Sequence, residues 1–114
     1  MQINSYSFGQ ITIDGCTYAS DVIIFHDRVN AAWFRKEEHR LEPLDVTTIL
    51  HAQPDVLIIG TGYAGVLIVP KPVIAHIEAQ HIDVIIDKTP KAIELFNAMQ
   101  AGNKYAIAAL HITC

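Results

Sequence analysis

Three glycines form the most suggestive chemical pattern in this chain. Gly60, Gly62 and Gly65 match the spacing G-x-G-x-x-G and follow the apolar run at 55–59, which predicts a buried strand that ends in a glycine loop. In a dinucleotide site such a loop opens a helix, because the helix N-terminus binds the pyrophosphate. Here the β-branched run at 66–70 follows instead and is typical of an extended segment. The sequence therefore predicts no nicotinamide or flavin, and we expect no cofactor.

The same loop has two further interpretations. Successive backbone N–H groups over Gly60-Thr61-Gly62 can form a concave site for a small anion or polar ligand. Alternatively, Gly60 and Gly62 only permit a sharp exit from the buried strand, because glycine adopts positive φ without a steric penalty. The sequence leaves both interpretations open.

Aromatic, basic and hydroxyl side chains supply the other binding candidates. An exposed Trp33, next to Arg35 and His39, can stack on a ligand or anchor a partner, whereas a buried Trp33 leaves the charges to solvent. Thr89 precedes a proline and fits the N-cap of a helix, although its hydroxyl can also meet a ligand. The predicted pocket or interaction surface therefore consists of Gly60, Thr61, Gly62, Trp33, Arg35, His39 and Thr89.

Histidine and cysteine near position 114 suggest a nucleophile, but the pattern argues against one. In a strand, His111 and Cys114 would point to opposite faces, and a terminal carboxylate on Cys114 would oppose thiolate formation. The six histidines show no H-x-x-x-H or H-E-x-x-H spacing, and neither Cys16 nor Cys114 lies in C-x-x-C. We therefore assign no catalytic residue and no metal site, and we expect two free thiols.

The elements that must position these residues follow from the apolar periodicity. Alternation over 6–13, a turn at Asp14-Gly15 and a return over 16–18 predict a β-hairpin. Further strands are predicted at 21–25, 55–59, 82–86 and 105–112, and residues 29–35 are expected to be extended. Helices are predicted from Pro43, from Pro72 and from Thr89, the last ending at Gly102.

The second half thus alternates strand and helix, which indicates a mainly parallel sheet with helices packed against it. We expect a single α/β domain over residues 1–114, with an antiparallel β addition at its N-terminus.

Composition and charge exclude several classes of protein. The chain has 114 residues, of which 51% are hydrophobic and 18% charged, enough for one domain with a buried core. A net charge of −4 disfavours binding to nucleic acid or anionic membrane. No run reaches the roughly 18 apolar residues of a membrane span, and the N-terminus shows no signal-peptide pattern. We therefore expect a cytoplasmic protein without membrane insertion.

An ordered set of short motifs also runs through nearly the whole chain. It consists of Asp21-Val22-Ile23-Ile24, Trp33, His39, Gly60-Thr61-Gly62, Ile82-Asp83-Val84, Thr89, Ala92, Phe96-Asn97 and His111-x-Thr113-Cys114. In these motifs the chain resembles the small-domain family that includes the mitochondrial complex I assembly factor 3 and the adipogenesis-associated domain protein, a family named after an uncharacterised methanogen protein.

The resemblance implies a three-layer α/β fold with a mixed central sheet and a projecting β-hairpin. It implies that this chain is a cytosolic bacterial relative of these proteins and that it has no established reaction. The assembly factor in the family suggests a protein-binding role for this chain. The resemblance provides no catalytic residue to carry over.

Two hypotheses for function follow. The first is a non-enzymatic interaction or assembly protein with an unidentified protein partner, with homo-oligomerisation as a further option. The second is a small-molecule or anion-binding protein, or an enzyme, that uses the Gly60-Thr61-Gly62 loop. Convergence of the candidate residues on one pocket with perturbed titratable groups would favour the second hypothesis.

The residues that follow the glycine loop predict that the protein binds no dinucleotide. Because residues 66–70 cannot open a phosphate-binding helix, a calorimetric titration of the purified protein with NAD or FAD should show no heat of binding. Micromolar affinity for either dinucleotide would contradict the prediction.

Overall fold

Two fully buried apolar strands form the centre of the larger sheet. The computed structural model describes residues 1–114, in which β6 (Val56–Gly60) and β8 (Ala106–Leu110) pair in parallel. Strands that are covered on both faces read as continuous apolar runs, which explains why the two sequences lack polar alternation. β7 (Asp83–Asp87) adds in parallel beside β6.

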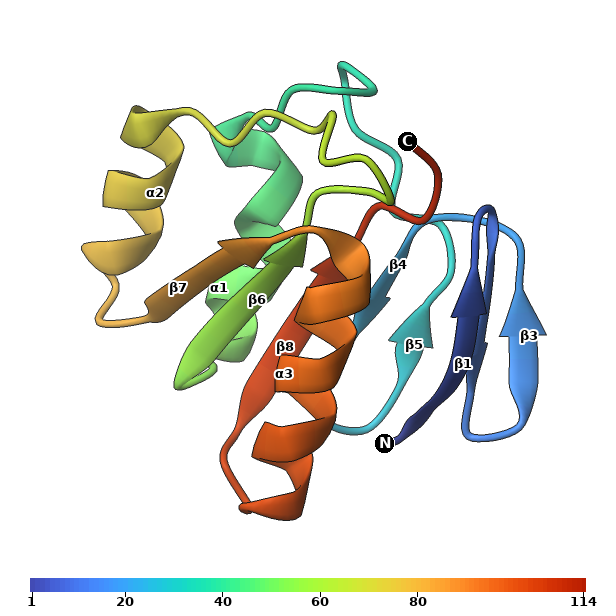
Figure 1. Cartoon of the computed structure of the whole chain (residues 1–114). Coiled ribbons are helices and arrows are strands. Elements are labelled where there is room, and N and C mark those ends of the chain that lie inside the picture. The colour runs from blue at the N-terminus through green and yellow to red at the C-terminus, as the bar shows by residue number, and fades with distance from the viewer.

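The other edge of this sheet is antiparallel. β4 (Val22–Ile24) pairs antiparallel with β8, and the short β5 (Val29–Asn30) pairs antiparallel with β4. The strand order is β5-β4-β8-β6-β7 (Figure 1). The sheet is therefore mixed, and it is parallel only in part rather than mostly parallel, because β4 and β5 join it through antiparallel pairs.

The N-terminal addition is a three-stranded antiparallel sheet instead of the predicted hairpin. It contains β1 (Ile3–Ser7), β2 (Gln10–Ile13) and β3 (Cys16–Tyr18) in that order. The predicted strand over 6–13 is divided at Gly9, whose φ of 77° permits a tight turn. The expected turn at Asp14-Gly15 is confirmed, since both residues have positive φ.

Helices cover both faces of the larger sheet. A 3-10 helix (Pro43–Val46) leads into α1 (Thr47–Ala52), and α2 (Lys71–Glu78) lies on the same face, whereas α3 (Thr89–Ala101) covers the opposite face (Figure 1). The predicted helix starts near Pro43, Pro72 and Thr89 are confirmed, as proline at the first turn of a helix leaves no bond unmade. None of these helices has the length and apolarity needed to cross a membrane.

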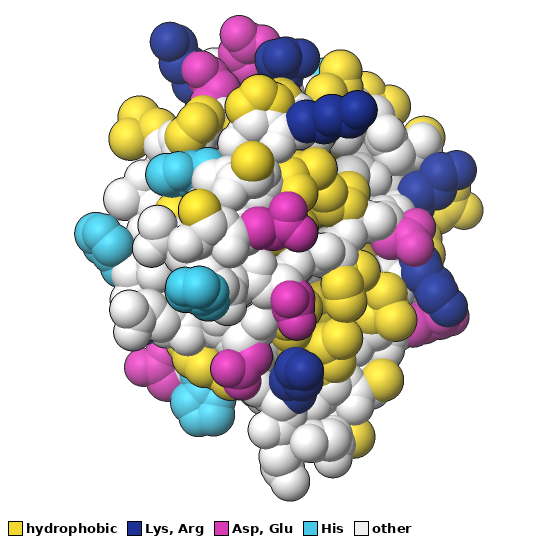
Figure 2. All heavy atoms as spheres, turned by 90° about the vertical axis from the view of Figure 1, so that its left-hand side faces the viewer, with side chains coloured by type: hydrophobic (Ala, Val, Ile, Leu, Met, Phe, Trp, Pro, Cys, Tyr) yellow, Lys and Arg dark blue, Asp and Glu magenta, His cyan; other side chains and the backbone are white.

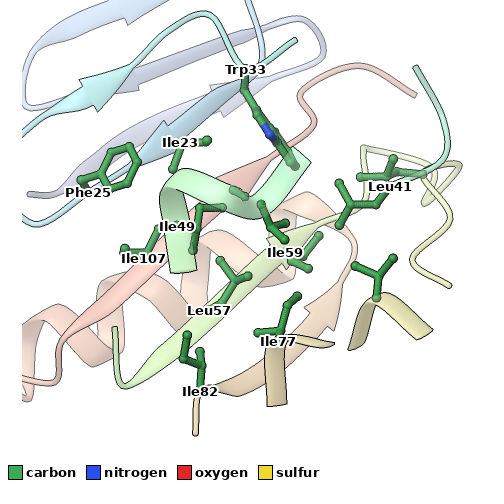
Figure 3. Close-up of a cluster of buried hydrophobic side chains, with 14 residues drawn as sticks. Ile23, Phe25, Trp33, Leu41, Ile49, Leu57, Ile59, Ile77, Ile82 and Ile107 are labelled. Atoms are coloured by element: carbon green, nitrogen blue, oxygen red, sulfur yellow. The ribbon is translucent and has the colours of Figure 1, made fainter. Parts of the chain in front are cut away.

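Alternation along the strands divides the core in two. Side chains such as Ile23, Leu57 and Ile107 pack against α1 and α2, and Figure 3 shows them beside Ile49. Their neighbours in sequence belong to a second cluster that contains side chains of α3, β1 and β2. The central strands β4, β8 and β6 are thus buried on both faces, whereas the edge strand β7 keeps exposed residues. The ends of the central strands and the loops that follow them remain as places for exposed chemistry.

The glycine loop after β6 has no helix, as predicted. Residues 61–70 are irregular, and Ile68 makes an isolated bridge with Arg40. Gly62 has φ of 107°, and a Cβ atom there would lie 2.4 Å from the carbonyl carbon of Cys114 and 2.9 Å from Cδ2 of His111. Glycine at this position therefore makes room for the passing segment of residues 111–114.

We expect Gly62→Ala to destabilise the fold. A non-glycine residue in this backbone region stores strain of about 1–3 kcal/mol, and the added Cβ meets backbone atoms that cannot swing away. Each 1 kcal/mol lowers the melting temperature of a domain of about 100 residues by about 4–8 °C.

Gly102→Ala is the matched control, because its φ is −89° and a Cβ there would have no neighbour closer than 3.7 Å. Differential scanning calorimetry should show a loss of several degrees for the first variant and little change for the second. Equal melting temperatures would refute this explanation of Gly62.

Candidate functional site

The last residues of the chain, 111–114, lie beside the carboxyl ends of the parallel strands of the larger sheet. In α/β sheets the carboxyl ends of the strands are the usual place for a binding site. Figure 1 shows the C-terminal segment beside the loop of residues 61–70. Backbone bonds join the two: the Tyr63 N–H donates to the Thr113 carbonyl at 2.7 Å and the Val66 N–H to the Cys114 carbonyl at 3.0 Å. The segment 111–114 is therefore held in a defined position although it is not part of β8.

Thr89 binds the segment 111–114 through its side chain. It is the first residue of α3, whereas Lys88 is the N-cap, so Thr89 does not cap the helix with its side chain as predicted. Its buried hydroxyl donates to the His111 carbonyl at 2.6 Å and accepts from the Gly62 N–H at 2.9 Å. One hydroxyl thus joins α3, the glycine loop and the C-terminal segment.

The amides of the glycine loop are bonded within the protein. The N–H and hydroxyl of Thr61 both donate to the Asp87 carbonyl, at 2.9 and 3.1 Å, and the Leu67 N–H donates to the Thr61 carbonyl. With the bonds of Gly62, Tyr63 and Val66, five loop amides already have acceptors. An anion site needs such amides free and pointing to a common centre, so the bonding pattern supports a structural role for the loop.

A buried ion pair lies beside the segment. Arg35 Nη2 donates to Asp21 Oδ2 at 2.6 Å, and the side chain of Arg35 is 3% exposed. The same carboxylate oxygen lies 2.8 Å from Nδ1 of the buried His111, and its second oxygen accepts from the Ile112 N–H. Burial alone would raise the pKa of Asp21, but hydrogen bonds from His111, Ile112 and Arg35 outweigh it and hold the pKa below its usual value.

Trp33 supports Arg35 from the core. Its side chain is 5% exposed, and its indole N–H donates to the Asp45 carbonyl at 3.1 Å. The guanidinium of Arg35 stacks over the indole at 4.6 Å, and it also donates to the Glu38 carbonyl. Figure 3 shows Trp33 on the side of the sheet that carries Ile49. Trp33 is thus a platform for Arg35, and its face is not open to a partner.

His111 also forms a cluster with His39 and Cys114. Cys114 Sγ lies 3.5 Å from His39 Nε2, and the rings of His39 and His111 are 5.4 Å apart. His111 and Cys114 do not point to opposite faces of a strand as predicted, because β8 ends at Leu110 and both residues lie beyond it. Sequence spacing could not reveal this cluster, since His39 and Cys114 are 75 positions apart.

Tyr6 brings the small sheet to the same segment. Its hydroxyl donates to the Ile112 carbonyl at 2.9 Å, and the Gly9 N–H donates to the same oxygen. Burial, together with Tyr63 and Asp21 nearby, raises the pKa of Tyr6 to about 12, so the phenol remains a donor at neutral pH.

A pocket of about 310 Å³ opens beside the ion pair. Trp33 and Arg35 line it together with Asp21, His111 and Phe34. Of the seven predicted residues, the other five do not line it. Gly60, Gly62, Thr89 and His39 contact the segment 111–114 instead, whereas Thr61 is bonded to Asp87 and Leu67. The structure thus gathers the predicted residues in one region but not on one pocket. Asp21 is the central residue that the sequence analysis missed; the signal for it is a carboxylate at the start of a buried strand.

We expect Asp21→Asn to destabilise the protein strongly. Breaking a buried ion pair costs about 3–5 kcal/mol because the remaining charge loses its partner, and the 16% exposure of Asp21 suggests the lower end of this range. Asp27→Asn is the control: Asp27 pairs with Arg28 in the open, with side chains 71% and 60% exposed, where pairs contribute about 0–1 kcal/mol. Urea unfolding measures the free energy of unfolding of both variants. Similar losses of this free energy in the two variants would contradict the prediction.

The fold is similar to several solved structures. A conserved hypothetical protein from Pyrococcus horikoshii OT3 is 28% identical, with a TM-score of 0.85 and 100% coverage of both chains. The Rpa2829 protein from Rhodopseudomonas palustris is 23% identical over 95% of this chain and 80% of its own, with a TM-score of 0.78. A Bordetella pertussis protein described as a Mth938-like domain is 16% identical over 97% of this chain and 85% of its own, with a TM-score of 0.71.

A protein-family model matches most of the chain. The model described as "Protein of unknown function (DUF498/DUF598)" matches residues 3–111. This range includes the glycine loop, the buried ion pair and His111. Because the match covers most of the chain, the protein belongs to the DUF498/DUF598 family of unknown function.

Proposed function

We propose that this chain is a non-enzymatic protein-binding domain of the assembly-factor kind, which acts in the cytoplasm. The observation that carries the proposal is a set of exposed apolar side chains around the segment 111–114, which we call the apolar rim. The rim consists of Phe8, Phe34, Tyr63, Val66 and Ile68, with exposures from 42% for Val66 to 84% for Phe34.

The members of the rim are held together through the segment that they surround. The rings of Phe8 and Tyr63 meet edge to face at 6.4 Å. Phe34 lines the pocket beside Thr113, and the Ile68 N–H donates to the carbonyl of His39, the residue that contacts Cys114. Exposed apolar groups that gather in this way are typical of interaction surfaces, where a few residues, among which tyrosine is enriched, supply most of the binding energy.

Charge favours a protein as the occupant of the rim. The net charge is −4, and Figure 2 shows acidic and basic side chains intermixed, with hydrophobic ones between them, on the face that carries α2. A chain with a net negative charge does not attract a polyanion. The sequence resemblance to a family that includes an assembly factor agrees with a protein partner.

The pocket beside Asp21 and Arg35 favours a second candidate function, the binding of a small molecule. Its volume of about 310 Å³ is at the lower end of the range for ligand sites, about 300–1,000 Å³. This candidate uses Arg35 and not the glycine loop, whose amides are bonded internally. Against it, the guanidinium of Arg35 is already paired with Asp21.

Affinity purification from the native cell, read by quantitative mass spectrometry, tests the proposal. We expect the wild-type protein to retain a stoichiometric partner and the double variant Phe34→Ser, Tyr63→Ser to lose it by tenfold or more, equivalent to about 1.4 kcal/mol. Leu44→Ser is the control, since Leu44 is 79% exposed but outside the rim.

Equal capture by all three proteins, or no partner for the wild type, would overturn the proposal. Light scattering on the purified proteins adds a separate outcome. A wild-type dimer that the rim variant dissociates would identify a second copy as the occupant and overturn an assembly role for the rim.

A further inference from the structure

We propose that His39, His111 and Cys114 form a zinc site with an open fourth position. Their ligand atoms all lie within 4.8 Å of one another. The inference is independent of the proposed protein-binding role, since a metal site can be structural or reactive in either case.

The separations suit zinc. Zinc binds sulfur at about 2.3 Å and imidazole nitrogen at about 2.0–2.1 Å, so a tetrahedral site places the two ligand atoms about 3.5 Å apart. The observed separation between Cys114 Sγ and His39 Nε2 is 3.5 Å. The remaining separations do not exceed 4.8 Å, and because Asp21 holds His111, the half-buried side chains of His39 and Cys114 are the ones that would move to complete the geometry.

Asp21 prepares His111 for this role. Its carboxylate lies 2.8 Å from Nδ1 and Arg35 Nη2 lies 3.2 Å from the same nitrogen, so Nε2 is the nitrogen available to a metal. The contact of Nε2 with the Thr113 hydroxyl, at 3.4 Å, is long for a hydrogen bond. A carboxylate behind a metal-binding histidine fixes the orientation of the ring and raises its basicity. Asp21 and the Glu38 carbonyl also bind the guanidinium of Arg35, which reduces its repulsion of a cation.

The ligands come from two backbone segments that are fixed before any ion binds. The carbonyl of Cys114 accepts from the Val66 N–H, and the carbonyl of His39 accepts from the Ile68 N–H at 2.8 Å. The bare Cα of Gly62 lets His111 and Cys114 approach the loop. His39 and Cys114 are half-buried, so an ion can enter from solvent and keep a water molecule as its fourth ligand.

The donor set selects among metals. Two imidazoles and a thiolate suit zinc, and the same set occurs in copper proteins that add an axial methionine. Both methionines of this chain, Met1 and Met99, pack against the core cluster on the α3 face instead. The structure therefore favours zinc over copper.

The test uses purified protein without a polyhistidine tag, stripped of metal and kept under reducing conditions. Competition with a chromophoric chelator measures zinc affinity, and cobalt serves as a spectroscopic probe, since a cobalt–thiolate bond produces a charge-transfer band in the near ultraviolet. We expect one equivalent of zinc, a thiolate band with cobalt, and a rise in melting temperature with zinc.

Cys114→Ser and His39→Gln should each weaken zinc binding by tenfold or more and abolish the rise in melting temperature, and Cys114→Ser should also remove the cobalt band. Cys16→Ser and His76→Gln replace exposed residues of the same types and should behave as the wild type. Because His39 and Cys114 are half-buried, their replacement could disturb the fold. Circular dichroism of both variants verifies that they are folded.

Absence of zinc binding by the wild type, or unchanged affinity in Cys114→Ser, would overturn the site. Neither result bears on the protein-binding proposal, because no partner is present in the assay.

Discussion

The hydrogen bonds between the glycine loop and the segment 111–114 are the constraint on which the rest of this structure depends. Backbone N–H groups at Tyr63 and Val66 donate to the segment, and the Thr89 hydroxyl joins it to α3 and Gly62. These bonds run between elements that are distant in sequence, and they place His111 above the carboxyl ends of β6 and β8. A residue with a side chain at Gly62 would displace the segment, so the glycine pattern that resembles a nucleotide loop here serves the packing of the chain on itself.

A buried charge network rests on this frame. Asp21 accepts hydrogen bonds from Arg35 and from the Ile112 amide and contacts His111, and Trp33 supports the guanidinium from the core. Such networks are costly when one member is removed, because the others stay buried without a partner. The network therefore links the orientation of His111 to the stability of the whole domain. It also holds the imidazole with one nitrogen directed away from the carboxylate, which is the condition for a metal ligand.

The apolar rim and the His39–His111–Cys114 cluster share the same rigid base. Ile68 is bonded to the backbone of His39, and Val66 to that of Cys114, so the exposed apolar groups and the half-buried ligands are positioned together. Rigid placement also lowers the entropy lost on binding, which favours specific recognition over adaptable contact.

The sequence by itself determined the strands of the larger sheet other than β5, the starts of the helices and the absence of a helix after the glycine loop. These features follow from local periodicity and from proline and glycine, as in the buried runs of β6 and β8 and the start of α2 near Pro72. The tertiary structure alone decided that Thr89 bridges three segments, that Trp33 is buried, and that His39 lies beside Cys114. It also divided the predicted first strand at Gly9 and made the sheet only partly parallel. The physical reason is that periodicity reports which face of an element is buried, whereas contacts between residues 75 or 90 positions apart depend on strand order and on where each strand ends.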